Sequence, residues 1–214
     1  ALRALRMGTV DMGRVSRRAA APVPGREVAL LERVRAARVF GGRYSLIRHC
    51  AQTAPAGIAC EFGVRRGWSL QIIRNFRKPP VFGFDSFEGL PADWNTGGDP
   101  YPAGTFACEP PADLATGVEL VRGWFADTIP AWKQANAGAV RLLHIDCDLY
   151  ESAREALFGM NDRIEPGSVL LFDELVDFDE TNYPRWREGE WRALNEWLVE
   201  CSRTVEPIGR TGHQ

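Results

Sequence analysis

The stretch VRLLHIDCDLYESA, residues 140–153, joins a short apolar run to an acidic turn and then to a helical pattern. Residues 140–145 have the length of a buried strand and end at a turn. Asp146 and Asp148 follow at once, and helical spacing begins near Tyr150. This order of strand, acidic turn and helix is the unit from which the rest of the chain is interpreted.

Four further apolar runs, each bounded by turn residues, are expected to be strands: 57–62, 80–84, 118–121 and 168–172. Helical stretches over 69–76 and 150–164 separate several of these runs. Strands that alternate with helices are expected to run parallel, through right-handed crossovers that place helices on both faces. The sequence therefore predicts an α/β fold with a doubly wound, mostly parallel sheet.

The N-terminal segment differs from this pattern. Residues 1–26 contain six arginines and one acid, and we expect a basic arm or lid there, followed by a single domain over residues 27–214. Two helices are expected within 26–51. The Pro- and Gly-rich stretch 89–111 is too long for a tight connection and is expected to be a lid or binding loop. A final antiparallel strand should run near the C-terminus, where we expect it to be incomplete or disordered.

Composition excludes several classes of function. The 214 residues have a formal net charge of −2, so no pull toward nucleic acid or an anionic membrane is expected. No apolar run approaches the roughly 20 residues of a membrane span. Five cysteines without a C-x-x-C pair argue against a disulfide framework or a zinc site and indicate a reducing, cytoplasmic setting. We also expect a homo-oligomer.

A carboxylate closes four of the five predicted strands. In open parallel sheets the ligand site lies beyond the carboxyl ends of the strands, so these acids should gather at one edge. Clustered like charges repel and are costly to desolvate, so something cationic is expected among them. The acids are Glu61, Asp85, Asp146 with Asp148, and Asp173 with Glu174.

The sharpest group is the one formed by two adjacent strand ends. Asp146, Asp173 and Glu174 would converge as hard oxygen ligands that suit Mg²⁺ or a similar cation. The string Asp146-Cys147-Asp148 can also be interpreted as the D-x-D of a metal-dependent glycosyltransferase. A pair of solvated acids is the plainer alternative, and the second acidic pair disfavours it.

The first strand ends in a glycine turn. Gly63 lets the backbone approach a ligand closely, and Ser69 can cap the following helix. The glycines at 63 and 67 do not form a dinucleotide-binding G-x-G-x-x-G, and Glu61 before them suits the ammonium of a methionine moiety better than a pyrophosphate. A purely structural turn is the alternative.

Three further positions are candidates for cofactor contacts. Asp85 can accept both ribose hydroxyls, or it can simply cap a turn. Trp124 and Phe125 could sandwich an adenine ring, or they could be ordinary core residues. His144 lies inside a strand and is interpreted as a satisfied core histidine.

Several of these motifs recur in one order over roughly residues 57–200, and together they resemble the macrocin O-methyltransferase family of natural-product sugar methyltransferases. The motifs are Glu61-Phe62-Gly63, Gly67-Trp68-Ser69, Phe84 to Pro91, Gly104-Thr105-Phe106, Asp127 to Pro130, His144 to Ser152 and Phe172-Asp173-Glu174.

The resemblance implies a class I, Rossmann-like methyltransferase that uses S-adenosylmethionine, Mg²⁺ and a sugar hydroxyl. It assigns metal ligation to Asp146, Asp173 and Glu174, and suggests Asp148 as the general base. Where the family usually has a second aspartate, this chain has Glu174, whose longer arm changes ligand reach. The cofactor residues are expected to be Glu61, Gly63, Ser69, Asp85, Ser86, Trp124, Phe125 and Asp146.

The sequence thus favours O-methylation of a sugar in an antibiotic-type glycoside or a nucleotide sugar. Methylation of a catechol-like small molecule, a D-x-D glycosyltransferase and a non-catalytic cofactor-binding module are the alternatives. The partner in the favoured hypothesis is a small-molecule sugar substrate, not a nucleic acid or a membrane.

Overall fold

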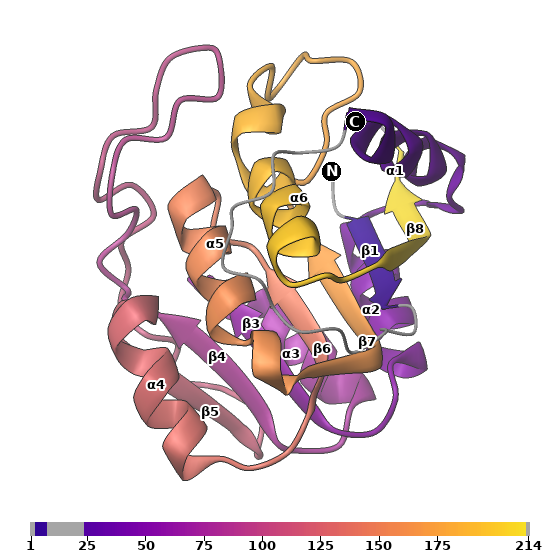
Figure 1. The fold of residues 1–214 in the computed structure, drawn as a ribbon. Helices are drawn as coiled ribbons and strands as arrows, with labels where there is room; N and C mark the ends of the chain where they lie inside the picture. Colours follow the sequence, from indigo (N-terminus) through magenta and orange to yellow (C-terminus); the bar gives the residue numbers. More distant parts are fainter. Residues whose placement is uncertain (1–2, 8–23, 213–214) are drawn as a thin grey trace.

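The computed structural model, which describes residues 3–7 and 24–212, places eight strands of this part of the chain in one sheet. The strands are β1 (Arg3–Met7), β2 (Val39–Phe40), β3 (Ile58–Phe62), β4 (Val81–Asp85), β5 (Val118–Arg122), β6 (Val140–Ile145), β7 (Ile164–Phe172) and β8 (Val205–Thr211). Their order across the sheet is β2-β8-β1-β7-β6-β3-β4-β5 (Figure 1).

The central part of the sheet is parallel, as predicted. β7, β6, β3, β4 and β5 pair in parallel with their neighbours, and all five predicted apolar runs are strands. β7 begins at Ile164, earlier than the expected 168, because the register shift between Val140 and Leu142 of β6 accommodates the extra residues. The predicted fold class is confirmed.

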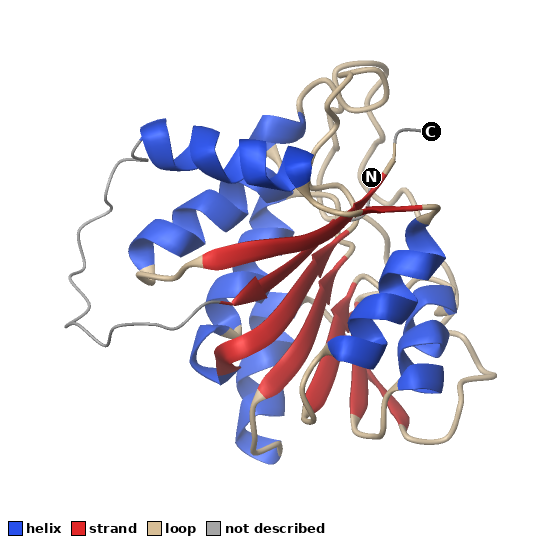
Figure 2. Cartoon of the chain, turned by 90° about the vertical axis from the view of Figure 1, so that its right-hand side faces the viewer, coloured by secondary structure: helices blue, strands red, loops and turns tan. Residues whose placement is uncertain are grey.

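Helices cover both faces of the sheet (Figure 2). They are α1 (Pro24–Ala36), α2 (Arg43–Thr53), α3 (Trp68–Phe76), α4 (Phe125–Ala135), α5 (Tyr150–Gly159) and α6 (Glu190–Glu200). Apolar residues of α1, α4, α5 and α6 pack in one buried cluster with one face of the sheet, and those of α2 and α3 pack in another. Burial of this apolar surface on two faces is the main stabilisation of such a layered fold.

The N-terminal segment contributes a strand. Residues 3–7, which were expected to belong to an arm or lid, instead form β1 between β7 and β8 and pair antiparallel with both. Pairing there satisfies backbone groups along β7 that an open edge would leave exposed. Residues 8–23 of the expected arm lie outside the described residues.

The C-terminal strand also differs from expectation. β8 is formed over Val205–Thr211 and pairs parallel with β2, so it is not incomplete over this range. The antiparallel neighbour of β7 is β1 rather than a C-terminal strand. None of the helices in the described part of the chain has the length and apolar character needed to cross a membrane.

The ends of β3 and β6 approach each other closely. Gly63, just after β3, has φ +90°, and a Cβ atom built there would lie 1.8 Å from the carbonyl oxygen of Asp146. The Asp146 amide donates to the carbonyl of Phe62 at 2.9 Å. This contact fixes the glycine turn against the acidic turn, and it requires glycine for both space and backbone conformation.

Gly63→Ala is expected to lower the free energy of unfolding by about 2–4 kcal/mol, because the added methyl group overlaps backbone atoms at a positive φ. Urea denaturation measures the change. Gly98→Ala is the matched control, because nothing lies within 4 Å of a Cβ there, and its effect should stay within about 0.5 kcal/mol. Equal stability of the two variants would contradict the close approach.

Candidate active site

A cavity of about 800 Å³ opens over the carboxyl ends of the parallel strands. This is the edge where the sequence predicts the ligand site, and the volume lies within the usual range for small-molecule sites. Ten of the eleven predicted site residues line it: Gly63, Ser69, Asp85, Ser86, Trp124, Phe125, Asp146, Asp148, Asp173 and Glu174.

Glu61 is the predicted residue that does not line the cavity. Its side chain has no exposed surface, and burial raises the pKa of its carboxyl group. Oε1 accepts a hydrogen bond from Ser69 Oγ at 3.1 Å, and Oε2 lies 2.8 Å from His144 Nδ1. Glu61 therefore reaches the glycine turn through Ser69. Ser69, expected to cap α3, is instead the second residue of that helix and donates to Glu61.

Asp85 organises the glycine turn. Its Oδ2 accepts hydrogen bonds from the amides of Val64 and Arg65, both at 2.7 Å, and its Oδ1 accepts from the amide of Phe87 at 2.7 Å. The turn-capping interpretation is thus confirmed by the Phe87 contact. A carboxylate has about four lone-pair sites, so three such bonds leave room for a ligand hydroxyl.

The two aromatic candidates occupy different environments. Trp124 lines the cavity with 37% of its surface exposed. Phe125 also reaches the cavity but packs edge-on against Phe62, with ring centroids 5.0 Å apart. Ser86 is buried and its Oγ accepts from the amide of Glu88 at 3.1 Å. Trp124 is therefore the aromatic side chain with the larger free surface.

The loop over residues 89–111, expected to be a lid or binding loop, contributes residues to the lining of the cavity. Trp94 and Tyr101 pair through a short antiparallel bridge and stack with ring centroids 5.2 Å apart. The ring of Tyr183 meets Trp94 edge-on at 5.3 Å, and Phe106 lies 5.8 Å from Tyr101. All four line the cavity and form an aromatic wall, defined here as Trp94, Tyr101, Phe106 and Tyr183.

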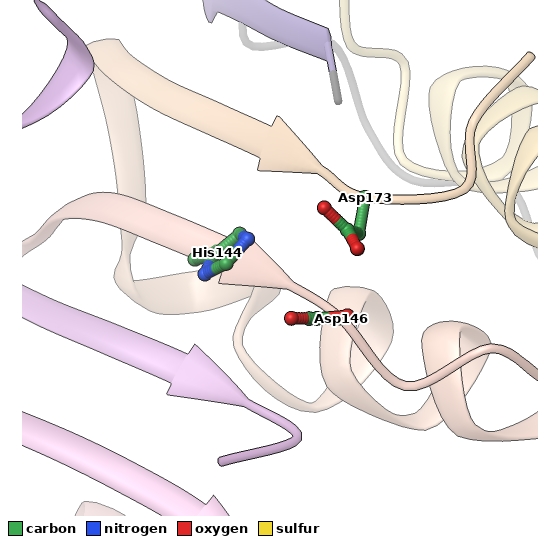
Figure 3. Close-up of side chains that lie close together, drawn as sticks. All are labelled: His144, Asp146 and Asp173. Atoms are coloured by element: carbon green, nitrogen blue, oxygen red, sulfur yellow. The ribbon is translucent and has the colours of Figure 1, made fainter. Parts of the chain in front are cut away.

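Two of the three acids that were predicted to converge, Asp146 after β6 and Asp173 after β7, lie close together. One ligand atom each from His144, Asp146 and Asp173 lies within 4.8 Å of the others (Figure 3). Glu174 lines the cavity but does not belong to this group of described residues. Its backbone amide donates to Glu190 Oε2 at 3.2 Å.

Arg43, the first residue of α2, supplies positive charge to this cluster. Its Nη2 lies 2.6 Å from Asp146 Oδ2, and its Nη1 lies 2.8 Å from Asp173 Oδ2. Burial by itself would lower the pKa of the guanidinium, but the two carboxylates outweigh it and the pKa is raised. The sequence indicated that a cation was needed but gave no sign that Arg43, some 100 residues earlier, would provide one.

Burial also raises the pKa values of the surrounding acids. It is the largest cause of the raised pKa values of Asp148, Asp173 and Glu174, and the negative charge of Asp146 adds to each. Asp148 lines the cavity in a left-handed backbone conformation with φ 64°. Aspartate adopts this conformation more readily than most residues.

The donor set fits a divalent cation. Asp146 and Asp173 offer hard oxygen atoms, and His144 offers a nitrogen. The expectation that His144 is a satisfied core residue is wrong in one respect. Its Nε2 is buried and has no hydrogen-bond partner among the described residues.

Glu190 is a further buried acid that the sequence did not reveal. Its side chain has no exposed surface, and burial, followed by the charge of Glu174, raises the pKa of its carboxyl group well above the ordinary 4.5. The native state therefore keeps this proton at pH values where the unfolded chain has lost it. Stability contributed by the protonated form falls as the pH rises from 4.5 toward the raised pKa.

Glu190→Gln is expected to raise the free energy of unfolding at pH 8 by on the order of 1–2 kcal/mol, because it removes the cost of a buried ionisable group. The increase in the free energy of unfolding should be smaller at pH 4.5. Thermal unfolding at both pH values measures the difference. Exposed Glu119→Gln is the control and should change neither value appreciably. A gain that does not depend on pH would contradict the assignment.

Comparison with known proteins agrees with this geometry. Residues 60–175 match a sequence family described as "Methyltransferase domain". The chain is 29% identical over 161 residues to the 8-demethyl-8-(2,3-dimethoxy-alpha-L-rhamnosyl)-tetracenomycin-C 4'-O-methyltransferase of Streptomyces olivaceus. That match covers 62% of this chain and 59% of the relative, so the chain spans less than two thirds of the relative's length.

Two solved structures share the fold. CalS11, a calicheamicin methyltransferase, superposes with a TM-score of 0.57 and 22% identity over 84% of this chain and 80% of its own. The O-methyltransferase NovP gives a TM-score of 0.56 and 21% identity over 78% of this chain and 80% of its own. Since the family match alone spans more than half of the sequence, the chain belongs to the methyltransferase domain family.

Proposed function

We propose that the protein is an S-adenosylmethionine-dependent O-methyltransferase that acts on a sugar hydroxyl of a natural product, in an antibiotic-type glycoside or a nucleotide sugar. The observation that carries the proposal is one cavity in which the glycine turn after β3 faces the acids at the ends of β6 and β7. The family match favours methyl transfer over the glycosyltransferase alternative. The Streptomyces olivaceus relative, by its name, methylates a rhamnosyl-bearing compound, which supports a sugar acceptor.

The cofactor is proposed to lie along the turns after β3, β4 and β6. Gly63 lines the cavity at the first of these turns, and Asp85 retains an acceptor site for a ribose hydroxyl while it holds the turn. Glu61 would act through Ser69 rather than by direct contact. The remaining proposed contacts are Ser86, Trp124, Phe125 and Asp146.

A divalent cation, Mg²⁺ or a similar ion, is proposed to be held by Asp146, Asp173 and Glu174. When bound, such a cation supplies positive charge that lowers the pKa of neighbouring hydroxyls. Asp146, Asp173 and Glu174 would hold the cation in the same cavity that the glycine turn after β3 lines.

Asp148 is proposed to be the general base. Methyl transfer forms a bond between the acceptor oxygen and the methyl carbon, breaks the bond from that carbon to the sulfonium sulfur, and releases the hydroxyl proton. Burial raises the pKa of Asp148, so its carboxylate is a stronger base than an exposed aspartate. The hydroxyl proton passes to this carboxylate.

The aromatic wall supports a sugar acceptor. The C–H faces of a sugar ring are apolar and pack against aromatic rings, while its hydroxyls remain free for polar partners. Trp94, Tyr101, Phe106 and Tyr183 line the side of the cavity formed by loops. The acceptor would lie between this wall and the acids.

A cytoplasmic homo-oligomer is proposed as the working form. Free cysteines at all five positions support a reducing compartment. The exposed apolar side chains of Trp68 and Phe76 on α3 support self-association. Light scattering after size exclusion tests the oligomeric state.

The wild-type protein is expected to bind S-adenosylmethionine in calorimetric titrations. Asp85→Ala should weaken binding by about tenfold or more, because three backbone amides of the cofactor turns lose their acceptor. Asp99→Ala is the matched control at an exposed position and should bind like the wild type. No binding by the wild type would contradict the proposed cofactor.

Asp148→Asn is expected to lower kcat by at least about 100-fold, because the acceptor proton then has no base. Asparagine tolerates the left-handed conformation at this position, so the fold should be retained. Affinity for S-adenosylmethionine should stay within about threefold, as measured by the same calorimetry. Unchanged turnover would refute the assignment of the base.

A further inference from the structure

His144 lies in β6 with both sides of its ring in the protein interior. Neither His144 nor Glu61 has exposed surface, and Glu61 Oε2 lies 2.8 Å from His144 Nδ1. With Nδ1 engaged by the carboxylate, Nε2 is the ring nitrogen that remains for another partner. Within the described chain it has none, although it is fully buried.

An unsatisfied buried polar atom costs roughly 1–3 kcal/mol, so its persistence calls for a physical reason. His144 stands beside Asp146 of its own strand end and Asp173 of the next (Figure 3). One ligand atom of each residue lies within 4.8 Å of the other two. A nitrogen donor and two carboxylates at this spacing can share one metal ion.

The Glu61 contact strengthens this reasoning. A histidine that binds a metal through one nitrogen commonly donates the N–H of the other to a carboxylate, which fixes the tautomer and orients the ring. Glu61 is placed to do this for His144. Such a role also explains why an acid with no exposed surface is kept at the end of β3.

We propose that His144 Nε2, Asp146 and Asp173 form a mixed nitrogen and oxygen site for a divalent transition metal, with Glu61 as the orienting carboxylate. The inference rests on the proposed metal-assisted function and deepens it, because it adds the nitrogen of His144 to the proposed carboxylate ligands. Imidazole binds first-row transition metals better than Mg²⁺. The site therefore prefers ions such as Mn²⁺ to Mg²⁺.

Arg43 would compete with a metal ion for these carboxylates. Its guanidinium contacts both Asp146 and Asp173, the two carboxylates that the ion needs. Two cations cannot share these oxygens at such distances without strong repulsion. The Arg43 side chain is 39% exposed, so part of it faces solvent.

The test is a titration of the untagged full chain with Mn²⁺, followed by electron paramagnetic resonance. Pulsed measurements should detect a directly coordinated ¹⁴N nucleus on bound Mn²⁺ in the wild type. His144→Gln should remove this signal and weaken Mn²⁺ binding by about tenfold or more. His49→Gln is the matched control and should keep the nitrogen signal.

Arg43→Gln should tighten Mn²⁺ binding by about tenfold, because the competing cation is gone. In the same titration, displacement of bound Mn²⁺ by Mg²⁺ should require a large molar excess of Mg²⁺. If His144→Gln does not fold, the wild-type nitrogen signal still decides the question.

Bound Mn²⁺ without nitrogen coupling, or no bound Mn²⁺, would overturn the inference. Methyl transfer to sugar acceptors, assayed in parallel, separates this outcome from failure of the proposed function. Activity without nitrogen coupling refutes the histidine ligand alone, whereas nitrogen coupling without methyl transfer to any sugar refutes the proposed function alone.

Discussion

The site depends on the contact of one guanidinium with two carboxylates. Arg43 at the start of α2 binds both Asp146 after β6 and Asp173 after β7. Without a cation there, two acids at adjacent strand ends would repel each other in a partly dry environment. The contact also ties α2 to the acidic edge of the sheet, so helix position and site charge are linked.

A second constraint fixes the wall of the cavity that the glycine turn after β3 forms. Gly63 passes so close to the Asp146 carbonyl that a side chain cannot fit. Asp85 accepts hydrogen bonds from three backbone amides of the two turns beside it. These contacts are made by backbone atoms and one carboxylate, which makes the wall rigid. A rigid turn facing a charged cluster suits a reaction that needs two ligands aligned.

The buried pair of Glu61 and His144 connects these two walls. One carboxylate oxygen of Glu61 accepts a hydrogen bond from Ser69 Oγ. The other lies 2.8 Å from His144 Nδ1. Two hydrogen bonds therefore connect the ring of His144, beside Asp146 and Asp173, to the start of α3. This chain of buried contacts joins the acidic edge of the sheet to the glycine turn.

The sequence by itself determined the parallel sheet and the edge that carries the site. Apolar runs bounded by turns defined β3, β4, β5, β6 and β7, and parallel strands necessarily bring their terminal acids to one edge, so ten of the predicted residues meet in one cavity. Only the tertiary structure decided the place of β1, the burial of Glu61, the open nitrogen of His144 and the role of Arg43. These depend on contacts between segments far apart in the chain, which local patterns of hydrophobicity and charge do not encode.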